Sequence, residues 1–171
     1  GVALNGDRVV IGSFRDDDQG TDAGAAYIFD YDSTNDSWNQ RAKLVAIDGG
    51  AGDYFGGTVS LQGDRIVVSA DAHDGSGADA GAAYVFEYDS NNGQWDPANK
   101  ITPDDIAAGD RFGWPVSLQN DRLVVGSFFD DDQGGQSGSA YVINLPHLEP
   151  NPSELVRGVW MYGFEAFDNA E

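Results

Sequence analysis

The sequence predicts an all-β protein built from β-propeller blades, which are four-stranded antiparallel units that here repeat every 57 residues. Asp7, Asp64 and Asp121 open similar apolar runs and lie 57 residues apart, and three tyrosines later in the units keep the same spacing. A fixed period of about 50 residues suits a propeller blade better than a helical solenoid. Short runs typical of strands recur within each unit, and no stretch carries a sustained helical period.

The second unit shows the expected strands most clearly. Residues 59–62 alternate apolar and polar side chains, as in a half-buried strand. Residues 65–70 are almost continuously apolar, so we expect them to be buried on both faces of the sheet. Residues 82–89 place aromatic side chains on one face at a period of two, and residues 95–102 follow a turn and supply a fourth, less regular strand. Four antiparallel strands, repeated, make a blade.

Three units in phase occupy residues 1–143, and the first begins part-way through the pattern. A closed propeller has about 4–8 blades, so we expect a partial propeller or a piece of a larger one. The chain is accordingly expected to be a processed or excised piece. Its unclosed sheet edges should pair with further blades, either in the same polypeptide or in an oligomer.

The repeat stops at Ile143. Residues 144–154 are rich in proline, which has no N–H to donate to a sheet, so we expect a linker or loop there. Residues 155–171 are apolar and aromatic. They are expected to form an extra outer strand for the third unit or the start of a next module.

Composition limits the classes of partner. Among 171 residues, 29 are acidic and nine are lysine or arginine, which gives a net charge of −20. Because this charge repels phosphate backbones, we expect no nucleic-acid partner. No run approaches the ~20 apolar residues of a membrane span, so no membrane insertion is expected. The absence of cysteine excludes thiolate catalysis and cysteine-based metal sites.

Aspartate supplies 24 of the acidic residues, and three explanations for this excess stay open. Aspartate favours turns because its short side chain hydrogen-bonds nearby backbone. It is also the usual oxygen ligand of calcium. An acidic surface with few lysines suits a salt-rich habitat, where salt screens the repulsion. None of these explanations excludes another.

The loops between the second and third strands concentrate the aspartates. In register they are residues 13–24, 70–81 and 127–138. Because loops at one edge of successive blades lie side by side, we expect one negative rim. The rim is either a solvated cluster of turns or a cation site, since close carboxylates repel unless a cation relieves them. No loop matches a full EF-hand. Calcium is the only cofactor considered, and its candidate ligands are Asp16, Asp17, Asp18, Asp71, Asp74, Asp130, Asp131 and Asp132.

The repeated aromatic residues are interpreted first as packing groups. Those expected to lie between blades are Phe55, Phe112, Tyr84 and Tyr141. Trp38 and Trp95 follow turns, so they are candidates for blade packing or for stacking on a sugar ligand. Asp64 and Arg65 are expected to form an ion pair at a strand start.

Sequence features of catalysis are scarce. The two histidines, His73 and His147, lie outside any repeated constellation, and His73 stands in the register of Asp16 and Asp130. The sequence has no nucleophile elbow, phosphate loop or metal-type histidine pair. Carboxylate pairs of the kind a glycosidase uses are too abundant to be informative. We therefore expect no enzyme.

The segments "GDRFG", "VSLQNDRLVVGS" and "GSAYV", between Gly109 and Val142, resemble the FG-GAP repeat in its bacterial form. This resemblance implies a β-propeller that is usually secreted or surface-bound and serves adhesion or ligand binding. Integrin-type repeats carry a calcium loop of the form Asp-x-Asp-x-Asp-Gly. Here the corresponding places hold only "LQGDR" and "LQNDR", so the calcium site of the family does not carry over.

These features predict a non-enzymatic binding or adhesion module that works outside the cell. It would bind a protein or glycan ligand through the loop rim. Two alternatives stay open: a lectin-like oligomeric propeller that binds glycans, with Trp38 or Trp95 stacking on the sugar, and a purely structural module of a larger surface protein.

Overall fold

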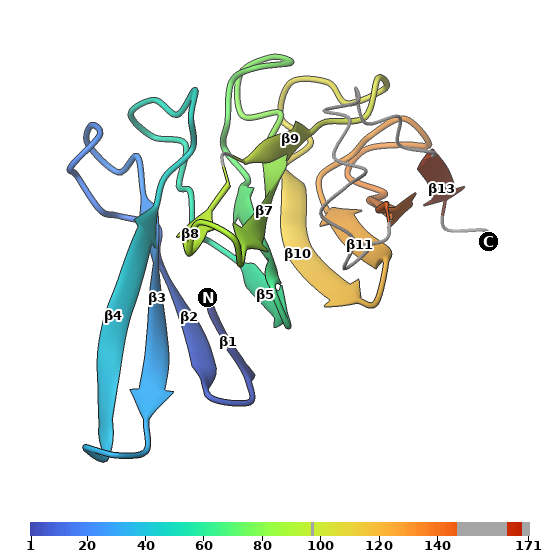
Figure 1. The fold of residues 1–171 in the computed structure, drawn as a ribbon. Helices are drawn as coiled ribbons and strands as arrows, with labels where there is room; N and C mark the ends of the chain where they lie inside the picture. The colour runs from blue at the N-terminus through green and yellow to red at the C-terminus, as the bar shows by residue number, and fades with distance from the viewer. Residues whose placement is uncertain (97, 147–163, 169–171) are drawn as a thin grey trace.

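A computed structural model of the protein describes residues 1–96, 98–146 and 164–168. These residues form thirteen strands in three antiparallel sheets, which stand side by side like segments of a fan (Figure 1). The described residues include no helix long and apolar enough to cross a membrane. The all-β fold of repeated propeller blades is confirmed.

Each sheet is one blade. Blade 1 contains β1 (Val2–Asn5), β2 (Arg8–Ser13), β3 (Ala25–Asp32) and β4 (Ser37–Leu44). Blade 2 contains β5 (Val59–Gln62), β6 (Arg65–Ala70), β7 (Ala82–Asp89), β8 (Gln94–Trp95) and β9 (Asn99–Ile101). Blade 3 contains β10 (Phe112–Gln119), β11 (Arg122–Ser127), β12 (Ser139–Asn144) and β13 (Phe164–Asp168).

The strands of each blade pair in chain order, and the register repeats from blade to blade. Val10 lies opposite Ile28, Val67 opposite Val85, and Val124 opposite Val142. The outer position of blade 2 is divided between β8 and β9, which both pair with β7. The predicted fourth strand at residues 95–102 is therefore two short segments. Residue 97, which lies between them, is a proline and has no N–H for a ladder.

The outer strand of blade 3 comes from the C-terminal segment. β13 pairs with β12 and places Phe167 opposite Ala140, just as Leu44 lies opposite Ala26 in blade 1. This strand comes later in the chain than the 57-residue register would put it. Most of the predicted proline-rich linker at 144–154 lies outside the described residues.

The two ends of the blades differ. At the hairpin end, two-residue turns join the first and second strands, and Gly6, Gly63 and Asn120 take positive φ angles there. Turns this short leave no room for a calcium loop of the integrin type. At the loop end, long loops join the second to the third strand and one blade to the next (Figure 1). The loops between the second and third strands carry all eight candidate calcium ligands.

Each blade has a front face, turned toward the preceding blade, and a back face, turned toward the following one. Alternate residues of a strand point to opposite faces, so one strand serves two interfaces. β6 is buried along its whole length between blades 1 and 3, as predicted. The largest side chains of the two interfaces are Phe55, Phe112, Tyr84 and Tyr141, which are at most 2% exposed, so their predicted packing between blades is confirmed.

Backbone also joins the blades at the loop end. Phe55 N–H donates to the carbonyl of Ala23 at 3.0 Å, and Phe112 N–H donates to that of Ala80 at 2.8 Å. Gly24 and Gly81, which follow these alanines in the chain, form parallel bridges with Phe55 and Phe112 respectively. Both glycines have positive φ angles, and a Cβ on either would lie within 2.2 Å of a backbone oxygen. Glycine is required there for close approach.

Candidate functional site

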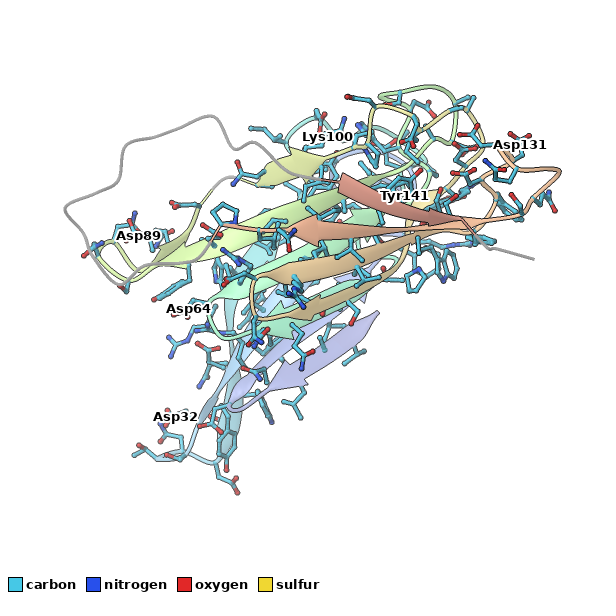
Figure 2. All side chains as sticks on the ribbon, turned by 90° about the vertical axis from the view of Figure 1, so that its right-hand side faces the viewer. Asp32, Asp64, Asp89, Lys100, Asp131 and Tyr141 are labelled. Carbon is cyan, nitrogen blue, oxygen red and sulfur yellow. The ribbon has the colours of Figure 1, made fainter. Side chains whose placement is uncertain are left out.

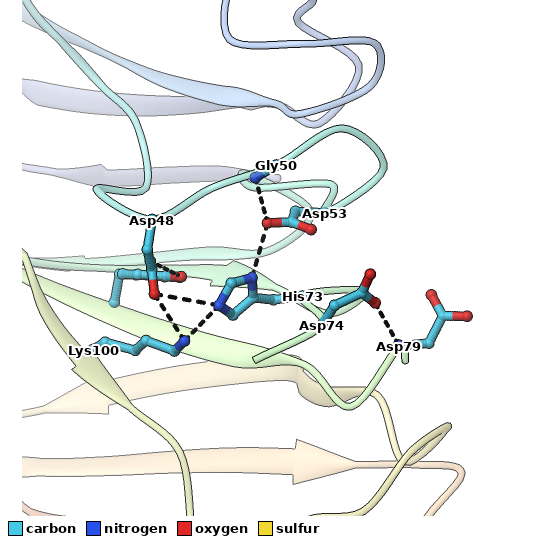
Figure 3. Close-up of polar contacts among 8 residues, drawn as sticks. Asp48, Gly50, Asp53, His73, Asp74, Asp79 and Lys100 are labelled. Carbon is cyan, nitrogen blue, oxygen red and sulfur yellow. Dashed lines mark hydrogen bonds and ion pairs between the residues drawn. The ribbon is translucent and has the colours of Figure 1, made fainter. Parts of the chain in front are cut away.

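A group of charged side chains lies on the loop end between blades 1 and 2. His73 follows β6, Asp48 and Asp53 lie in the loop between the blades, and Lys100 comes from β9 (Figure 3). His73 Nδ1 is 2.8 Å from Asp53 Oδ2, and both side chains are buried. His73 Nε2 contacts Lys100 Nζ and lies 3.4 Å from Asp48 Oδ2. We call these four residues the histidine cluster.

The contacts fix the roles of the histidine nitrogens. An ammonium group can only donate, so a charged Lys100 requires Nε2 of His73 to accept. Nδ1 then carries the proton and donates it to Asp53. Asp53 also accepts from Gly50 N–H at 2.8 Å, which fixes its carboxylate. His73 is therefore held on both sides by charged partners.

Asp48 lies at the exposed edge of the histidine cluster. It accepts from Lys100 Nζ at 2.9 Å and from the Tyr84 hydroxyl at 2.8 Å. Partial burial raises the pKa of Asp48, but these two hydrogen bonds outweigh it and lower the pKa to about 2. The pKa of Tyr84 is raised by burial and by its bond to this carboxylate. Asp48 is therefore ionised at neutral pH.

The histidine cluster lines an open hollow of about 490 Å³, whose rim also includes Gly50, Ala51, Asp74 and Gly75. Lys100 and Asp48 remain partly exposed there, at 28% and 45% of their side chains. The hollow thus presents one ammonium donor beside several carboxylate acceptors. Such a set suits a polar ligand, and a cationic group above all, since acids outnumber bases in it.

Blades 1 and 3 carry a different arrangement in the same register. Asp16 accepts from Lys43 Nζ and from the Tyr27 hydroxyl, and these hydrogen bonds lower the pKa of Asp16. Asp130 accepts from the Tyr141 hydroxyl at 3.3 Å. In blade 2 a histidine replaces this aspartate, so the equivalent tyrosine turns to Asp48 instead.

The structure gives local partners to most of the candidate calcium ligands. Asp16 and Asp18 pair with Lys43, and Asp71 pairs with Arg111 at 3.3 Å. Side chains of Asp17, Asp74 and Asp130 accept backbone N–H groups within their own loops, which is turn chemistry. Asp131 and Asp132 are exposed on the third loop.

These acids do not converge on one point. Among residues 1–96, 98–146 and 164–168, no group of three or more histidine or acidic side chains is arranged to hold a metal ion. Close acids do affect one another in blade 3, where burial and then the charges of Asp130 to Asp132 raise the pKa of Asp110. The alternative of a calcium site is tested by the melting experiment in the Discussion.

The two candidate tryptophans lie away from this rim. Trp38 and Trp95 belong to outer strands near the hairpin end, where Asp32, Asp64 and Asp89 also lie, whereas Lys100 and Asp131 are at the loop end (Figure 2). Trp38 is 48% exposed, and Trp95 is partly buried. A glycan site built on both tryptophans would therefore be separate from the histidine cluster.

Comparison with protein families matches the FG-GAP repeat at residues 1–29, 38–86 and 95–143. Each match ends in the third strand of a blade, and the second and third matches begin in the outer strand of the preceding blade. Together the three matches cover most of the chain. The chain belongs to the FG-GAP repeat family. Comparison with curated proteins gave no match.

The residues that name the FG-GAP repeat are structural in this chain. Phe55 and Phe112 fill the space between blades, and the glycine after each lies against the backbone of the preceding blade. The histidine cluster is not part of this shared pattern. The sequence analysis did not predict this cluster, because its residues do not recur in the repeat. The available signal was His73, which stands where the other units have an aspartate.

Proposed function

We propose that this FG-GAP chain is a non-enzymatic binding module that works outside the cell and holds a protein ligand at its loop end. The open hollow over the histidine cluster carries this proposal, because it presents exposed charged side chains on tightly packed blades. The blades below it are packed and buried, so the loops are presented by a stable scaffold.

The charge of the loop end indicates the kind of ligand. The net charge is −20, and the exposed acids Asp17, Asp18, Asp74, Asp131 and Asp132 belong to its loops. A basic segment of a protein ligand would be attracted over a distance and then held by direct pairs with Asp48 or Asp74. Lys100, which lines the hollow, would donate to a carboxylate or carbonyl oxygen of the same ligand.

The geometry supports binding rather than catalysis. Both nitrogens of His73 are engaged, one by Asp53 and one by Lys100. Asp48 lies near Nε2 as well, at 3.4 Å, so the partners of His73 are charged side chains. We infer that the buried dyad of His73 and Asp53 supports the loop.

Binding to immobilised basic and acidic peptides tests the proposal. We expect the basic peptides to bind, and we expect Asp48→Asn and Asp74→Asn to weaken binding while Trp38→Ala leaves it unchanged. The affinity should fall as salt is added, because the attraction is electrostatic. Equal binding by wild type and both asparagine variants would contradict the loop-end site.

Detection of the native protein on intact cells or in the medium tests the extracellular location.

The lectin-like alternative is favoured by one observation, the exposed ring of Trp38 beside Tyr31, whose centroid is 5.4 Å away. A flat exposed aromatic ring is a common platform for a sugar. A glycan array separates the two proposals, since binding lost in Trp38→Ala and kept in Asp74→Asn would favour the lectin.

A further inference from the structure

An arginine crosses the junction between blades 1 and 2 at the hairpin end. Arg8 Nε lies 2.8 Å from Asp30 in its own blade, and its Nη1 lies 3.1 Å from Asp64 of blade 2. The guanidinium carbon is 5.3 Å from the ring centroids of both Tyr88 and Trp95. Blade 2 thus receives the arginine of the preceding blade in a socket made of two aromatic rings and one carboxylate.

The next junction repeats the arginine. Arg65 stands 57 residues after Arg8, is 3% exposed, and contacts Glu87 in its own blade at 2.7 Å. It reaches Asp121 of blade 3 at 3.3 Å, the position equivalent to Asp64. A blade therefore projects this arginine from its back face into the front of the blade that follows.

Blade 1 carries an equivalent socket on its front face, and no blade of the described chain precedes it. Tyr31 and Trp38 have centroids 5.4 Å apart with an interplanar angle of 50°, against 5.4 Å and 56° for Tyr88 and Trp95. Asp7 has the position of Asp64. Asp36, which accepts from the Tyr31 hydroxyl, adds a second carboxylate where blade 2 has a glycine.

Apolar side chains around this socket are exposed as well. Val2, Leu4 and Ile11 are 72%, 65% and 40% exposed. The residues equivalent to Leu4 and Ile11 are Leu61 and Val68 in blade 2 and Leu118 and Val125 in blade 3, and none of these is more than 9% exposed. The front face of blade 1 therefore has the composition of a blade interface without the partner.

The back face of blade 3 is the matching half. Arg122, in the register of Arg8 and Arg65, is exposed and lies opposite Asn144, where the other blades have a carboxylate. Val124 is 41% exposed, whereas its equivalents Val10 and Val67 are fully buried. Arg122 and Val124 thus repeat the groups that Arg8 and Val10 bring to the junction with blade 2.

We propose that a second copy of this chain binds head to tail, with its blade 3 against blade 1 and its Arg122 in the socket of Tyr31, Trp38 and Asp7. Each copy carries both halves of the junction, and the two junctions inside the chain show how the halves fit. A head-to-tail contact of this kind closes into a ring when the rotation allows. Two copies would supply six blades, within the range of about 4–8 found in closed propellers.

Complementary variants test this contact. Leu4→Asp damages the front face and leaves the back face intact, and Val124→Asp does the reverse. We expect each variant alone to sediment as a monomer and an equal mixture to form a dimer through the two intact faces. High salt should be used, because it screens repulsion between chains of net charge −20. A mixture of two folded variants that remains monomeric would overturn the proposal, and so would the finding that these faces are covered only by blades of a longer polypeptide.

The socket has its own test. Arg122→Ala and Trp38→Ala should each weaken association about 2- to 30-fold, the range of a cation–aromatic contact. The double variant should lose little more than either single one, since both remove the same contact. Fully additive losses would show that Arg122 does not occupy the socket.

A cross-link gives a measurement that does not depend on affinity. Leu118 N–H donates to Ser60 Oγ at 3.0 Å across the junction of blades 2 and 3, and the equivalent pair between copies is Leu4 and Ser117. The chain has no cysteine, so Leu4→Cys and Ser117→Cys mixed under oxidising conditions should give a disulfide-linked dimer. Ser33→Cys, on an exposed hairpin, is the control for Leu4→Cys. Equal cross-linking in both mixtures would contradict the contact.

Discussion

The carboxylate of Asp71 in blade 2 lies 3.3 Å from the guanidinium of Arg111 in blade 3. Asp71 is 5% exposed, so this is a nearly buried charge. At the equivalent positions of the preceding junction, Phe14 packs edge to face on Tyr54 with centroids 6.0 Å apart. One pair of positions therefore holds an aromatic contact at one junction and an ion pair at the next.

Arg111→Ala should destabilise the protein by about 3 kcal/mol, because it leaves the Asp71 carboxylate buried without its partner. Burial already raises the pKa of Asp71, although Arg111 opposes that effect. The stability lost in Arg111→Ala should therefore be largest near neutral pH, where Asp71 is charged. The loss should shrink as the pH falls to about 4, because the folded protein takes up a proton at Asp71 before the unfolded chain does. Urea unfolding at both pH values measures this.

Two controls accompany this variant. Asp79 also pairs with Arg111, at 3.1 Å, but is half exposed, so Asp79→Asn should cost less than about 1 kcal/mol. Adding Asp71→Asn to Arg111→Ala should recover much of the stability, since it removes the unpaired charge. No recovery would mean that Arg111 acts through packing alone.

Gly24→Ala and Gly81→Ala should each cost roughly 3 kcal/mol, because the added Cβ would meet the backbone of the next blade. Gly138 is the matched control. It also has a positive φ, but its nearest neighbour would be 3.3 Å away, so Gly138→Ala should cost only about 1–2 kcal/mol of backbone strain. Thermal unfolding of the three variants checks this order, and equal losses would contradict it.

The two tryptophans should differ although they share one register. Trp95→Ala should cost about 2 kcal/mol, because Trp95 packs against the core between blades 1 and 2 and holds Arg8. Trp38→Ala should change the stability of a monomer by less than about 1 kcal/mol, since its ring is exposed. Denaturant melts at low protein concentration compare them, and a larger loss in Trp38→Ala would be the contrary result.

Alkaline pH should unfold the protein through its buried tyrosines. Burial raises the pKa of both Tyr84 and Tyr141, and nearby aspartates add to this. Above about pH 10 the tyrosines of the unfolded chain ionise, whereas these two stay protonated in the folded state, so stability falls as the pH rises. Tyrosinate absorbance should show them ionising only with unfolding, and Tyr84→Phe should reduce the dependence on pH.

Calcium and sodium chloride of equal ionic strength should raise the melting temperature alike, by screening the acidic surface. We expect no specific calcium effect because these carboxylates already have partners in the protein. Asp16, Asp18 and Asp71 pair with cationic side chains, and Asp17 accepts a backbone N–H. Asp17→Asn and Asp131→Asn should leave both shifts unchanged. An excess shift in calcium that either substitution abolishes would restore a calcium site.

The fold could be predicted from the sequence because the repeat restates it three times. The strand at residues 65–70 and the packing of Phe55 and Phe112 follow from period and polarity alone. The pairs that charged residues form could not be predicted from period and polarity. The expected ion pair between Asp64 and Arg65 is wrong, because Asp64 binds Arg8, whereas Arg65 binds Glu87 and Asp121. Successive strand residues point to opposite faces, so adjacent charges serve different junctions.

The candidate site was harder to predict for a similar reason. Asp48, Asp53, His73 and Lys100 are spread over more than 50 residues, and only the return of the chain between blades brings them together. No local spacing motif marks such a group. The departure of His73 from the aspartate register shows that blade 2 differs, but the identity of the partners depends on the tertiary fold.

The junctions also bear on how such a gene can change length. Because the strands of every blade pair in one register, loss or duplication of one whole unit of coding sequence would keep that register in the blades that then meet. Deletion of blade 2 would bring the positions of Phe14 and Arg111 to one junction, and a guanidinium can stack on an aromatic ring. Unequal recombination between repeats would thus alter the number of blades in a single step.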